Sequence, residues 1–313
     1  MDNYADKLLN AVKRKGNPCI VGLDPRLDQM PDFVKATPRD NLDRAVRRSI
    51  IAYHKCIIRA VAGLVPGVKL QSAFYEQYGI GGMQAFMDTV RYARERGLVV
   101  IIDAKRNDIS STAEAYANAF LGRTQIFGNS TKVIDADCIT VSPYLGKDSL
   151  DPFVEACKAY GKGIFILVKT SNPGSSDLQD RKLSDGSELY IRVAELVNRY
   201  SEGLTGELGY SPIGAVVGAT FPEEAMRLRK LMPRSIFLVP GYGAQGGTAA
   251  MAAECFNDDG YGAVVNASRS LTYGLGSPGI SRSEAVKEIK NRTKEMIERV
   301  NEAIRTKTEK RSA

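Results

Sequence analysis

The sequence of 313 residues contains a single histidine and no tryptophan. One histidine excludes a zinc site built from several histidines, and any Ser-His-Asp relay would have to use His54. His54 lies within an expected helix, four residues after Ile50 and three before Ile57, so we expect a structural role for it. If the chain is an enzyme, its acid–base chemistry falls to lysine, aspartate or glutamate.

Long hydrophobic runs are also missing. The longest apolar stretches, Leu98–Ile102 and Ile164–Val168, are far shorter than the ~20 residues that cross a bilayer. The chain starts with Met1-Asp2-Asn3-Tyr4 and continues with mixed charge, without the apolar segment of a signal peptide. We therefore expect no membrane partner and a cytoplasmic location.

The cysteines are few and scattered. There are five of them, an odd number, and none forms a C-x-x-C motif. Several lie in or beside apolar segments, which predicts buried free thiols in a reducing compartment. They are Cys19, Cys56, Cys138, Cys157 and Cys255.

The chain carries a modest positive charge of +7, much of it near the C-terminus. Residues 281–313 contain ten Lys or Arg and six Asp or Glu, and opposite signs alternate as on a solvated helix face. We expect no nucleic-acid partner for this segment, although binding of nucleic acid by the basic tail is an alternative to test. The last residues, 306–313, are expected to form a flexible tail. The remaining positive charge suits an anionic small-molecule substrate.

Eight short apolar segments recur along the chain, each bounded by Gly, Pro or Asp. Near-continuous hydrophobicity, rather than strict alternation, is typical of parallel strands that are covered on both faces. The segments are Cys19–Leu23, Val68–Gln71, Leu98–Asp103, Cys138–Ser142, Ile164–Lys169, Ile213–Gly218, Ile236–Pro240 and Tyr261–Asn266.

Helical patterns, with apolar residues three and four apart, lie between these segments. They cover Asn41–Ala62, Gly82–Arg96, Ser111–Phe127, Lys147–Tyr160, Glu188–Ser201, Glu223–Leu231 and Thr248–Cys255. Eight β-α alternations predict one α/β domain over residues 1–313, a single (β/α)8 TIM barrel. An extra N-terminal helix, Tyr4–Lys13, precedes the first strand, and a long C-terminal helix begins at the capping-box pattern Ser281–Glu284. The polar stretch at 172–186 is expected to be a long active-site loop.

The densest group of charged residues, Asp103-Ala104-Lys105-Arg106-Asn107-Asp108, directly follows the apolar run of the third strand. Residues two apart on an extended chain share a face, so Asp103 and Lys105 project together. These residues alone allow two interpretations. One is a salt bridge at a strand end with Asp108 as a helix cap. The other is an ammonium flanked by carboxylates in a cleft, where lysine stays protonated and acts as a general acid.

The run DAKRNDISST resembles the D-x-K-x-x-D-I-x-x-T motif of orotidine 5′-phosphate decarboxylases, in the form of their longer bacterial class (type 2). Arg106 stands where shorter members usually carry a hydrophobic residue. The resemblance extends from VGLDP near the start to NASRS near residue 270. It implies decarboxylation of orotidine 5′-monophosphate to UMP and CO₂ in de novo pyrimidine biosynthesis, with no metal and no cofactor.

The resemblance also implies roles for individual residues. Lys105 would protonate C6 of the pyrimidine within a charge array completed by Asp103, Asp108 and Lys69. Asp108 would reach the active site of a neighbouring subunit, together with Ile109 and Thr112, which implies a homodimer. The remaining matched positions would bind substrate, Asp24 at the ribose, Ser171 at the pyrimidine amide edge and Pro240 beside the base.

A glycine-rich G-x-G-x-x-G stretch at residues 241–246 lies between an expected strand and helix. A dinucleotide-binding fold would require an acidic residue about 20 positions later at a strand end, but the next strand ends in Asn266. In a barrel, the loops after the seventh and eighth strands commonly bind phosphate. The resemblance places Gln245 and Arg269 on the substrate phosphate. At Ser268, where the family often has Gly, it carries over only a backbone contact.

Other functions remain open at this point. The nearest alternative is a magnesium-dependent sugar-phosphate decarboxylase or aldolase built on the same barrel and charge array. A non-catalytic barrel that senses a nucleotide or phosphate would keep Gln245 and Arg269, but it would not need Asp103, Lys105 and Asp108 together.

Overall fold

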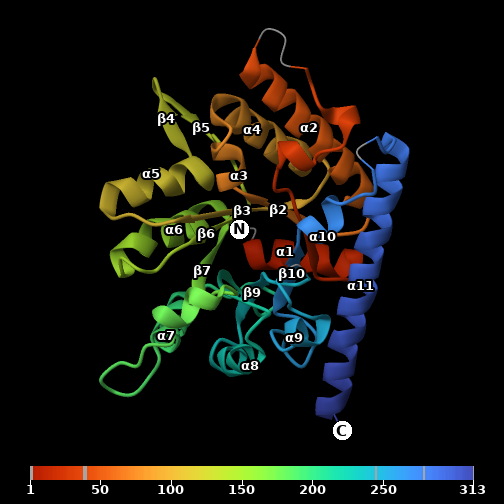
Figure 1. Cartoon of the computed structure of the whole chain (residues 1–313). Helices are drawn as coiled ribbons and strands as arrows, with labels where there is room; N and C mark the ends of the chain where they lie inside the picture. Colours follow the sequence, from red (N-terminus) through yellow and green to blue (C-terminus); the bar gives the residue numbers. More distant parts are fainter. Residues whose placement is uncertain (1–2, 38–40, 244, 278, 313) are drawn as a thin grey trace.

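Eight parallel strands close into a barrel, surrounded by helices (Figure 1). The computed structural model describes residues 3–37, 41–243, 245–277 and 279–312. The strand order around the barrel is β1-β10-β9-β8-β7-β6-β3-β2, which follows the chain order throughout. The predicted single (β/α)8 barrel is therefore confirmed. The strands are β1 (Cys19–Gly22), β2 (Gly67–Gln71), β3 (Val99–Arg106), β6 (Cys138–Val141), β7 (Gly163–Lys169), β8 (Ser211–Val217), β9 (Ser235–Val239) and β10 (Ala263–Ala267).

The helices agree closely with the expected ranges, and both the additional N-terminal helix and the long C-terminal helix are present. They are α1 (Tyr4–Lys15), α2 (Leu42–Val61), α3 (Ala73–Glu76), α4 (Gly79–Glu95), α5 (Ser110–Phe120), α6 (Lys147–Tyr160), α7 (Leu189–Ser201), α8 (Pro222–Leu231), α9 (Ala249–Ala253), α10 (Arg269–Thr272) and α11 (Arg282–Ser312). Short 3₁₀ turns occur at Leu27–Gln29, Asp32–Val34 and Pro173–Asp177. No helix in the described ranges combines the length and the apolar character that crossing a membrane requires.

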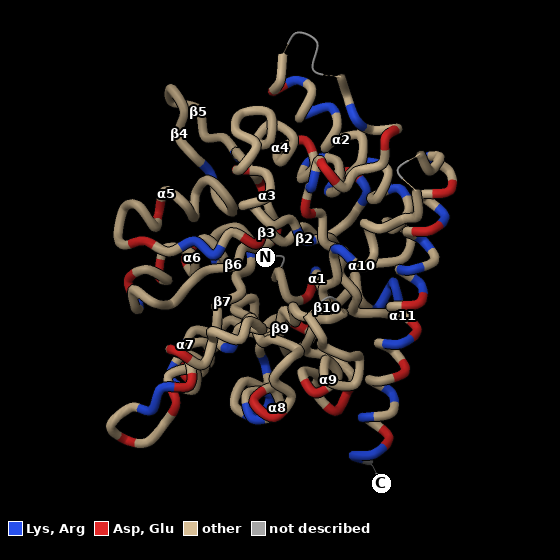
Figure 2. The backbone as a smooth tube through the Cα atoms, viewed as in Figure 1, with Lys and Arg blue, Asp and Glu red and all other residues tan. Residues whose placement is uncertain are grey.

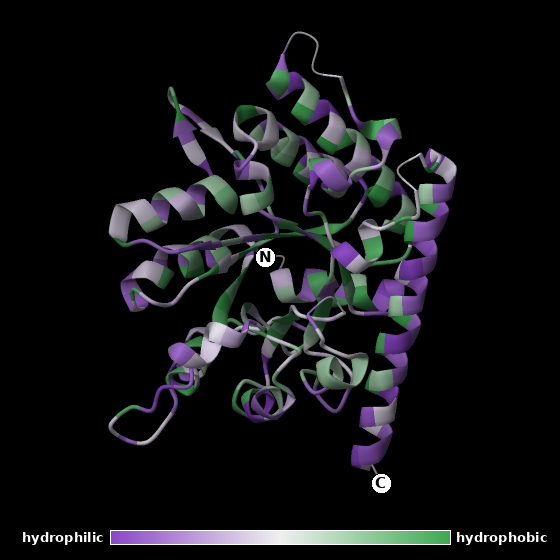
Figure 3. Cartoon of the chain, viewed as in Figure 1, coloured by the Kyte–Doolittle hydropathy of each residue, from purple (hydrophilic) through white to green (hydrophobic). Residues whose placement is uncertain are grey.

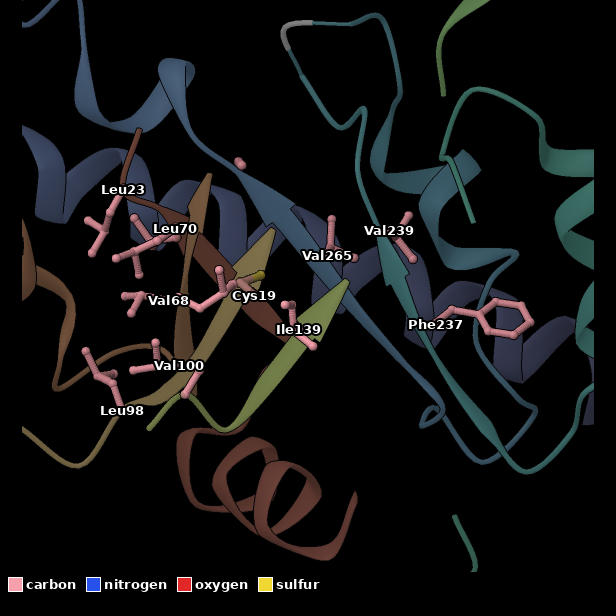
Figure 4. Packing of buried hydrophobic residues seen from close by; sticks show 14 of the residues in the cluster. Cys19, Leu23, Val68, Leu70, Leu98, Val100, Ile139, Phe237, Val239 and Val265 are labelled. Atoms are coloured by element: carbon pink, nitrogen blue, oxygen red, sulfur yellow. The ribbon is translucent and has the colours of Figure 1, made fainter. Parts of the chain in front are cut away.

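The core has two parts, because successive strand residues point alternately outward and inward. Outward side chains, such as Val68, Val100 and Val265, pack between the strands and the surrounding helices (Figure 4). Inward side chains pack on α1, where the Tyr4 ring meets the Phe165 ring edge-on at 6.2 Å. Apolar colour accordingly concentrates in the central strands, and polar colour along the outer helices (Figure 3). Since α1 fills the barrel at its amino-terminal end, the carboxyl ends of the strands are left to form a site.

One predicted helix is wrong in its second half. The sequence predicted a helix over Ser111–Phe127, but the helix ends at Phe120. The chain then forms an antiparallel hairpin of β4 (Thr124–Ile126) and β5 (Asn129–Thr131). Phe127 and Gly128 form its turn with φ of +48° and +80°. Such two-residue turns with positive φ match the twist of paired strands.

The C-terminal segment expected to be a flexible tail is helical instead, since α11 continues to Ser312; Ala313 lies outside the described residues. The ammonium of Lys307 donates to the carbonyl oxygens of Ala253 and Phe256 at 3.0 and 2.8 Å. These contacts hold the last turns of α11 to the end of α9. Charges of opposite sign alternate along the exposed side of α11, as expected (Figure 2).

The five cysteines are all buried and free, as predicted. His54 is fully buried, with Nδ1 3.3 Å from the Thr89 hydroxyl and 3.2 Å from the Tyr75 hydroxyl. Burial lowers the pKa of His54 to about 3, so the ring is neutral at physiological pH. Its surroundings are those of a core residue.

Candidate active site

A cavity of about 570 Å³ opens at the carboxyl ends of the barrel strands. Nine of the twelve predicted site residues line it, although they come from strand ends and loops spread over the whole chain. They are Asp24, Lys69, Asp103, Lys105, Ser171, Pro240, Gln245, Ser268 and Arg269. The other three, Asp108, Ile109 and Thr112, do not line the cavity of this chain.

The centre of the site is an ionic array around Asp103 at the end of β3. Lys69 on β2 donates to Asp103 Oδ2 at 3.0 Å, and Lys105 donates to Oδ1 at 2.7 Å. Burial would raise the pKa of Asp103, but the two ammonium groups outweigh it and hold the pKa well below its usual value. Burial would likewise lower the pKa of Lys69, but the carboxylates of Asp103 and Asp24 outweigh it and raise the pKa. Asp103 and Lys69 are therefore both charged at neutral pH.

The backbone of β3 is irregular at the array. Lys105 has φ of +46°, in the left-handed region that non-glycine residues seldom occupy. Its N–H donates to the hydroxyl of Thr140 on β6 at 2.9 Å, and the same hydroxyl donates to Asp103 Oδ1 at 2.9 Å. Thr140 is fully buried beneath the array, and the sequence motif did not include it.

A second polar network joins the ends of β1, β2 and β10. The Ser268 hydroxyl donates to Asp24 Oδ2 at 2.6 Å, and the Gln71 N–H donates to Asp24 Oδ1 at 3.3 Å. A Cβ atom at Gly22 would lie 2.5 Å from Ser268 Cβ, so glycine is needed there for β1 and the β10 loop to approach. Ser268 thus contributes its side chain to the site, beyond the backbone contact that was expected.

The loops after β7 and β9 are linked across the cavity. The Ser171 hydroxyl donates to Gln245 Oε1 at 2.7 Å. Gly241 has φ of +93°, and a Cβ atom there would lie 3.0 Å from Ser171 Cβ, so this turn requires glycine. Arg269 begins α10 on the neighbouring loop, is exposed, and has no ion-pair partner within the described ranges. Its guanidinium is therefore available to an anion.

The segment at 172–186 is a loop between β7 and α7, as expected, and part of it borders the cavity. The Gln179 side chain exchanges two hydrogen bonds with Thr170, at 2.9 Å to the backbone N–H and 2.8 Å to the hydroxyl. Fully buried Lys169 pairs with Asp180 at 2.5 Å. These contacts anchor the middle of the loop, while its outer turn projects from the barrel beside α7 (Figure 1).

The cavity also includes residues that the sequence analysis did not select. The Arg26 guanidinium stacks on the Phe74 ring at 4.5 Å from its centroid, and Asn266 on β10 has a buried Oδ1 with no hydrogen-bond partner in the described part of the chain. Leu167, Val216 and Leu238 give the cavity an apolar side. A strand-end position was the only signal available for Asn266, and that signal is shared by many structural residues.

The charges of the cavity favour an anionic ligand. Four basic side chains line it, and only Asp24 and Asp103 oppose them. A cavity lined by apolar and by mostly cationic side chains suits a planar ring that carries anionic substituents. A phosphorylated nucleoside has this combination.

The segment after the array faces outward. Asp108 accepts the N–H of the adjacent Ile109 at 2.8 Å, and Ile109 is half exposed. Arg106 pairs with Glu76 at 2.5 Å, which connects this segment to the apolar groove formed beside Glu76 by Ile80 and Met83 at the start of α4. The acidic group expected to complete the array therefore lies on an exposed, partly apolar surface.

The chain is similar to known proteins over most of its length. Residues 20–273 match the orotidine 5′-phosphate decarboxylase / HUMPS family. The chain is 48% identical to an orotidine 5′-phosphate decarboxylase of Rhodopirellula baltica, over 87% of this chain and 89% of the relative. It is 43% identical to one of Caldicellulosiruptor bescii, over 87% and 90%. The solved Leishmania donovani OMP decarboxylase superposes with a TM-score of 0.73 at 30% identity, covering 96% of this chain and 98% of that one. The chain belongs to the orotidine 5′-phosphate decarboxylase / HUMPS family.

Proposed function

We propose that the protein decarboxylates orotidine 5′-monophosphate to UMP and CO₂ in pyrimidine biosynthesis, with Lys105 as the proton donor to C6. The observation that carries this proposal is the Asp103 carboxylate held between the ammonium groups of Lys69 and Lys105 at the rim of a cationic cavity. The family match and the identity of 48% to a decarboxylase support the same reaction.

In the proposed step the bond from C6 to the carboxyl carbon breaks, and its electron pair stays on C6 as CO₂ leaves. Lys105 stabilises the developing negative charge and then transfers an ammonium proton to C6, after which solvent reprotonates the amine. Asp103, ionised at neutral pH, faces the substrate carboxylate and raises the energy of the ground state. One charge pair at ~4 Å contributes only about 4 kcal/mol at an effective dielectric constant of ~20.

Most of the required stabilisation must therefore come from elsewhere, since large enzymatic rate enhancements need up to about 23 kcal/mol. We assign it to a preorganised site and to binding energy from groups that do not react. In this assignment Arg269 and Gln245 bind the phosphate, with a backbone contact from Ser268, and Asp24 and Lys69 bind the ribose. Ser171 contacts the pyrimidine amide edge, and Pro240 lies beside the base.

We further propose a homodimer in which Asp108, Ile109 and Thr112 of each subunit enter the partner's site. Asp108 and Ile109 lie outside the chain's own cavity, and Ile109 is half exposed. Ile80 and Met83, which line a groove beside Glu76, are 66% and 37% exposed and supply apolar surface for such a contact. We expect this enzyme to act in the cytoplasm, where its free thiols stay reduced.

The test is to follow the loss of orotidylate absorbance with purified protein and no added cofactor, with and without EDTA. We expect turnover that EDTA leaves unchanged. Absence of turnover by the folded protein would contradict the proposed reaction. Loss of turnover in EDTA, restored by Mg²⁺, would favour the magnesium-dependent alternative.

A further inference from the structure

The pairing of β3 with β6 is irregular directly under the ionic array. Ile102 pairs with Ile139, and the next pair is Arg106 with Val141. Three residues of β3, 103–105, therefore face the single residue Thr140 on β6. Bulges of this kind bend a strand and redirect its side chains, and they are frequent beside active sites.

The bulge places Lys105 in a backbone conformation that a lysine does not adopt without support. Its φ of +46° puts Cβ in a crowded position, so the conformation persists only where surrounding contacts enforce it. The bulge also separates the Lys105 N–H from the regular ladder between the two strands. A side chain must replace the missing backbone acceptor.

Thr140 provides that acceptor. Its hydroxyl accepts the Lys105 N–H at 2.9 Å and donates its one hydrogen to Asp103 Oδ1 at 2.9 Å. The ammonium of Lys105 donates to the same Oδ1 at 2.7 Å, while Asp103 Oδ2 accepts from Lys69. One buried hydroxyl thus connects the backbone and the ionic partner of Lys105, and both carboxylate oxygens are held.

We propose that Thr140 is a positioning residue for the decarboxylation: it stabilises the bulge and thereby directs the Lys105 ammonium to Asp103 and into the cavity. This inference rests on the proposed function of Lys105. Thr140 itself does not line the cavity, so it acts through Lys105 and Asp103 and makes no contact with substrate. Without its hydroxyl, the Lys105 N–H and Asp103 Oδ1 each lose a partner in a buried place.

The experiment compares Thr140→Val, which keeps the shape and removes the hydroxyl, with Thr140→Ser, which keeps the hydroxyl. Thr293→Val is the matched control, because Thr293 is equally buried and its hydroxyl donates only to the Ile289 carbonyl of α11 at 2.7 Å. For Thr140→Val we expect kcat to fall by about 10- to 100-fold, because a small misplacement of a reacting group slows the chemical step by this much. The Kd of UMP should change by less than about threefold. Thr140→Ser and Thr293→Val should stay within about threefold of wild-type kcat.

Wild-type kcat in Thr140→Val, or an equal loss of kcat in all three variants, would overturn the inference. A crystal structure of Thr140→Val provides a test that does not depend on activity. We expect Lys105 to leave the left-handed region or its Nζ to move away from Asp103. An unchanged φ and an unchanged Lys105–Asp103 contact would contradict the positioning role. Absence of turnover in the wild-type protein would instead contradict the proposed function.

Discussion

The ammonium nitrogen of Lys105 lies 2.7 Å from the carboxylate oxygen Oδ1 of Asp103, two residues earlier on the same strand. Lys105 makes this contact from the bulge of β3, where its backbone has φ of +46°. Asp103 is buried, whereas the Lys105 side chain is 46% exposed. A fixed carboxylate therefore holds an ammonium group that can still reach a ligand.

Removal of the ammonium group tests the proposed proton donor. Lys105→Ala should lower kcat by at least about 10²–10⁴-fold, the range for a lost general acid, while UMP still binds. Steady-state turnover and calorimetric titration with UMP measure the two effects. Lys147→Ala is a suitable control, since Lys147 is an exposed lysine paired with Asp151 on α6. Turnover near the wild-type rate in Lys105→Ala would show that another group protonates C6.

The phosphate assignment predicts an effect that depends on the substrate. Arg269→Ala should raise KM and lower kcat/KM for orotidine 5′-monophosphate by about 10- to 100-fold, because a hydrogen bond to a charged group contributes about 1.5–3 kcal/mol. Orotidine, which lacks the phosphate, should react equally slowly with wild type and variant. Arg123→Ala, directly before β4, is the control, because Arg123 is hydrogen-bonded to Ser130 on the β4–β5 hairpin and does not line the cavity. Equal losses with both substrates would mean that Arg269 acts elsewhere.

The shared active site predicts complementation between two inactive variants. Lys105→Ala and Asp108→Ala should each be nearly inactive alone. After subunit exchange, each hybrid dimer would have one site with both groups intact, so the mixture should recover about a quarter of wild-type activity. Activity after mixing, together with sedimentation to establish the dimer, measures this. No recovery from dimers that have exchanged subunits would place Asp108 in its own subunit's site.

The single histidine, His54, predicts that part of the free energy of unfolding is lost in acid. Burial lowers the pKa of His54 to about 3, so between this value and about 6.5 the unfolded chain binds a proton that the folded chain does not. The free energy of unfolding should therefore decrease as the pH falls below about 6.5, by up to about 1.4 kcal/mol per pH unit.

Chemical denaturation at pH 5 to 7 measures this effect in a range above the usual carboxylate pKa values. His54→Gln should remove the component and flatten the dependence on pH, even if it lowers stability at pH 7. An identical slope in the variant would show that His54 is protonated in the folded protein or that other groups dominate.

The local pattern of residues was sufficient to predict the barrel and its main charged motif. Eight apolar segments with helical spacing between them have few ways to bury their apolar faces, and a closed parallel sheet is one of these. Asp103, Lys105 and Asp108 lie within six residues, so their grouping is visible in the chain itself. Helix ends were less visible, as the hairpin after Phe120 shows, because Ile126 and Phe127 lie seven residues after Ala119 and Phe120 and so continue the helical spacing of apolar residues.

Contacts between distant parts of the chain could not be predicted from the sequence and are seen only in the closed barrel. Lys69 pairs in register with Ile101, two residues before Asp103, so both side chains project from the same face of neighbouring strands. Thr140 meets Lys105 because it lies opposite residues 103–105 of the bulge. Asn266 borders the cavity as a residue of β10, whereas Gln179 reaches it from the loop after β7, where it is hydrogen-bonded to Thr170. No short stretch of sequence encodes such a register, since it results from the packing of all eight strands together. This packing brings the residues of the charged motif together with Lys69 and Thr140 into an array with a buried carboxylate at its centre.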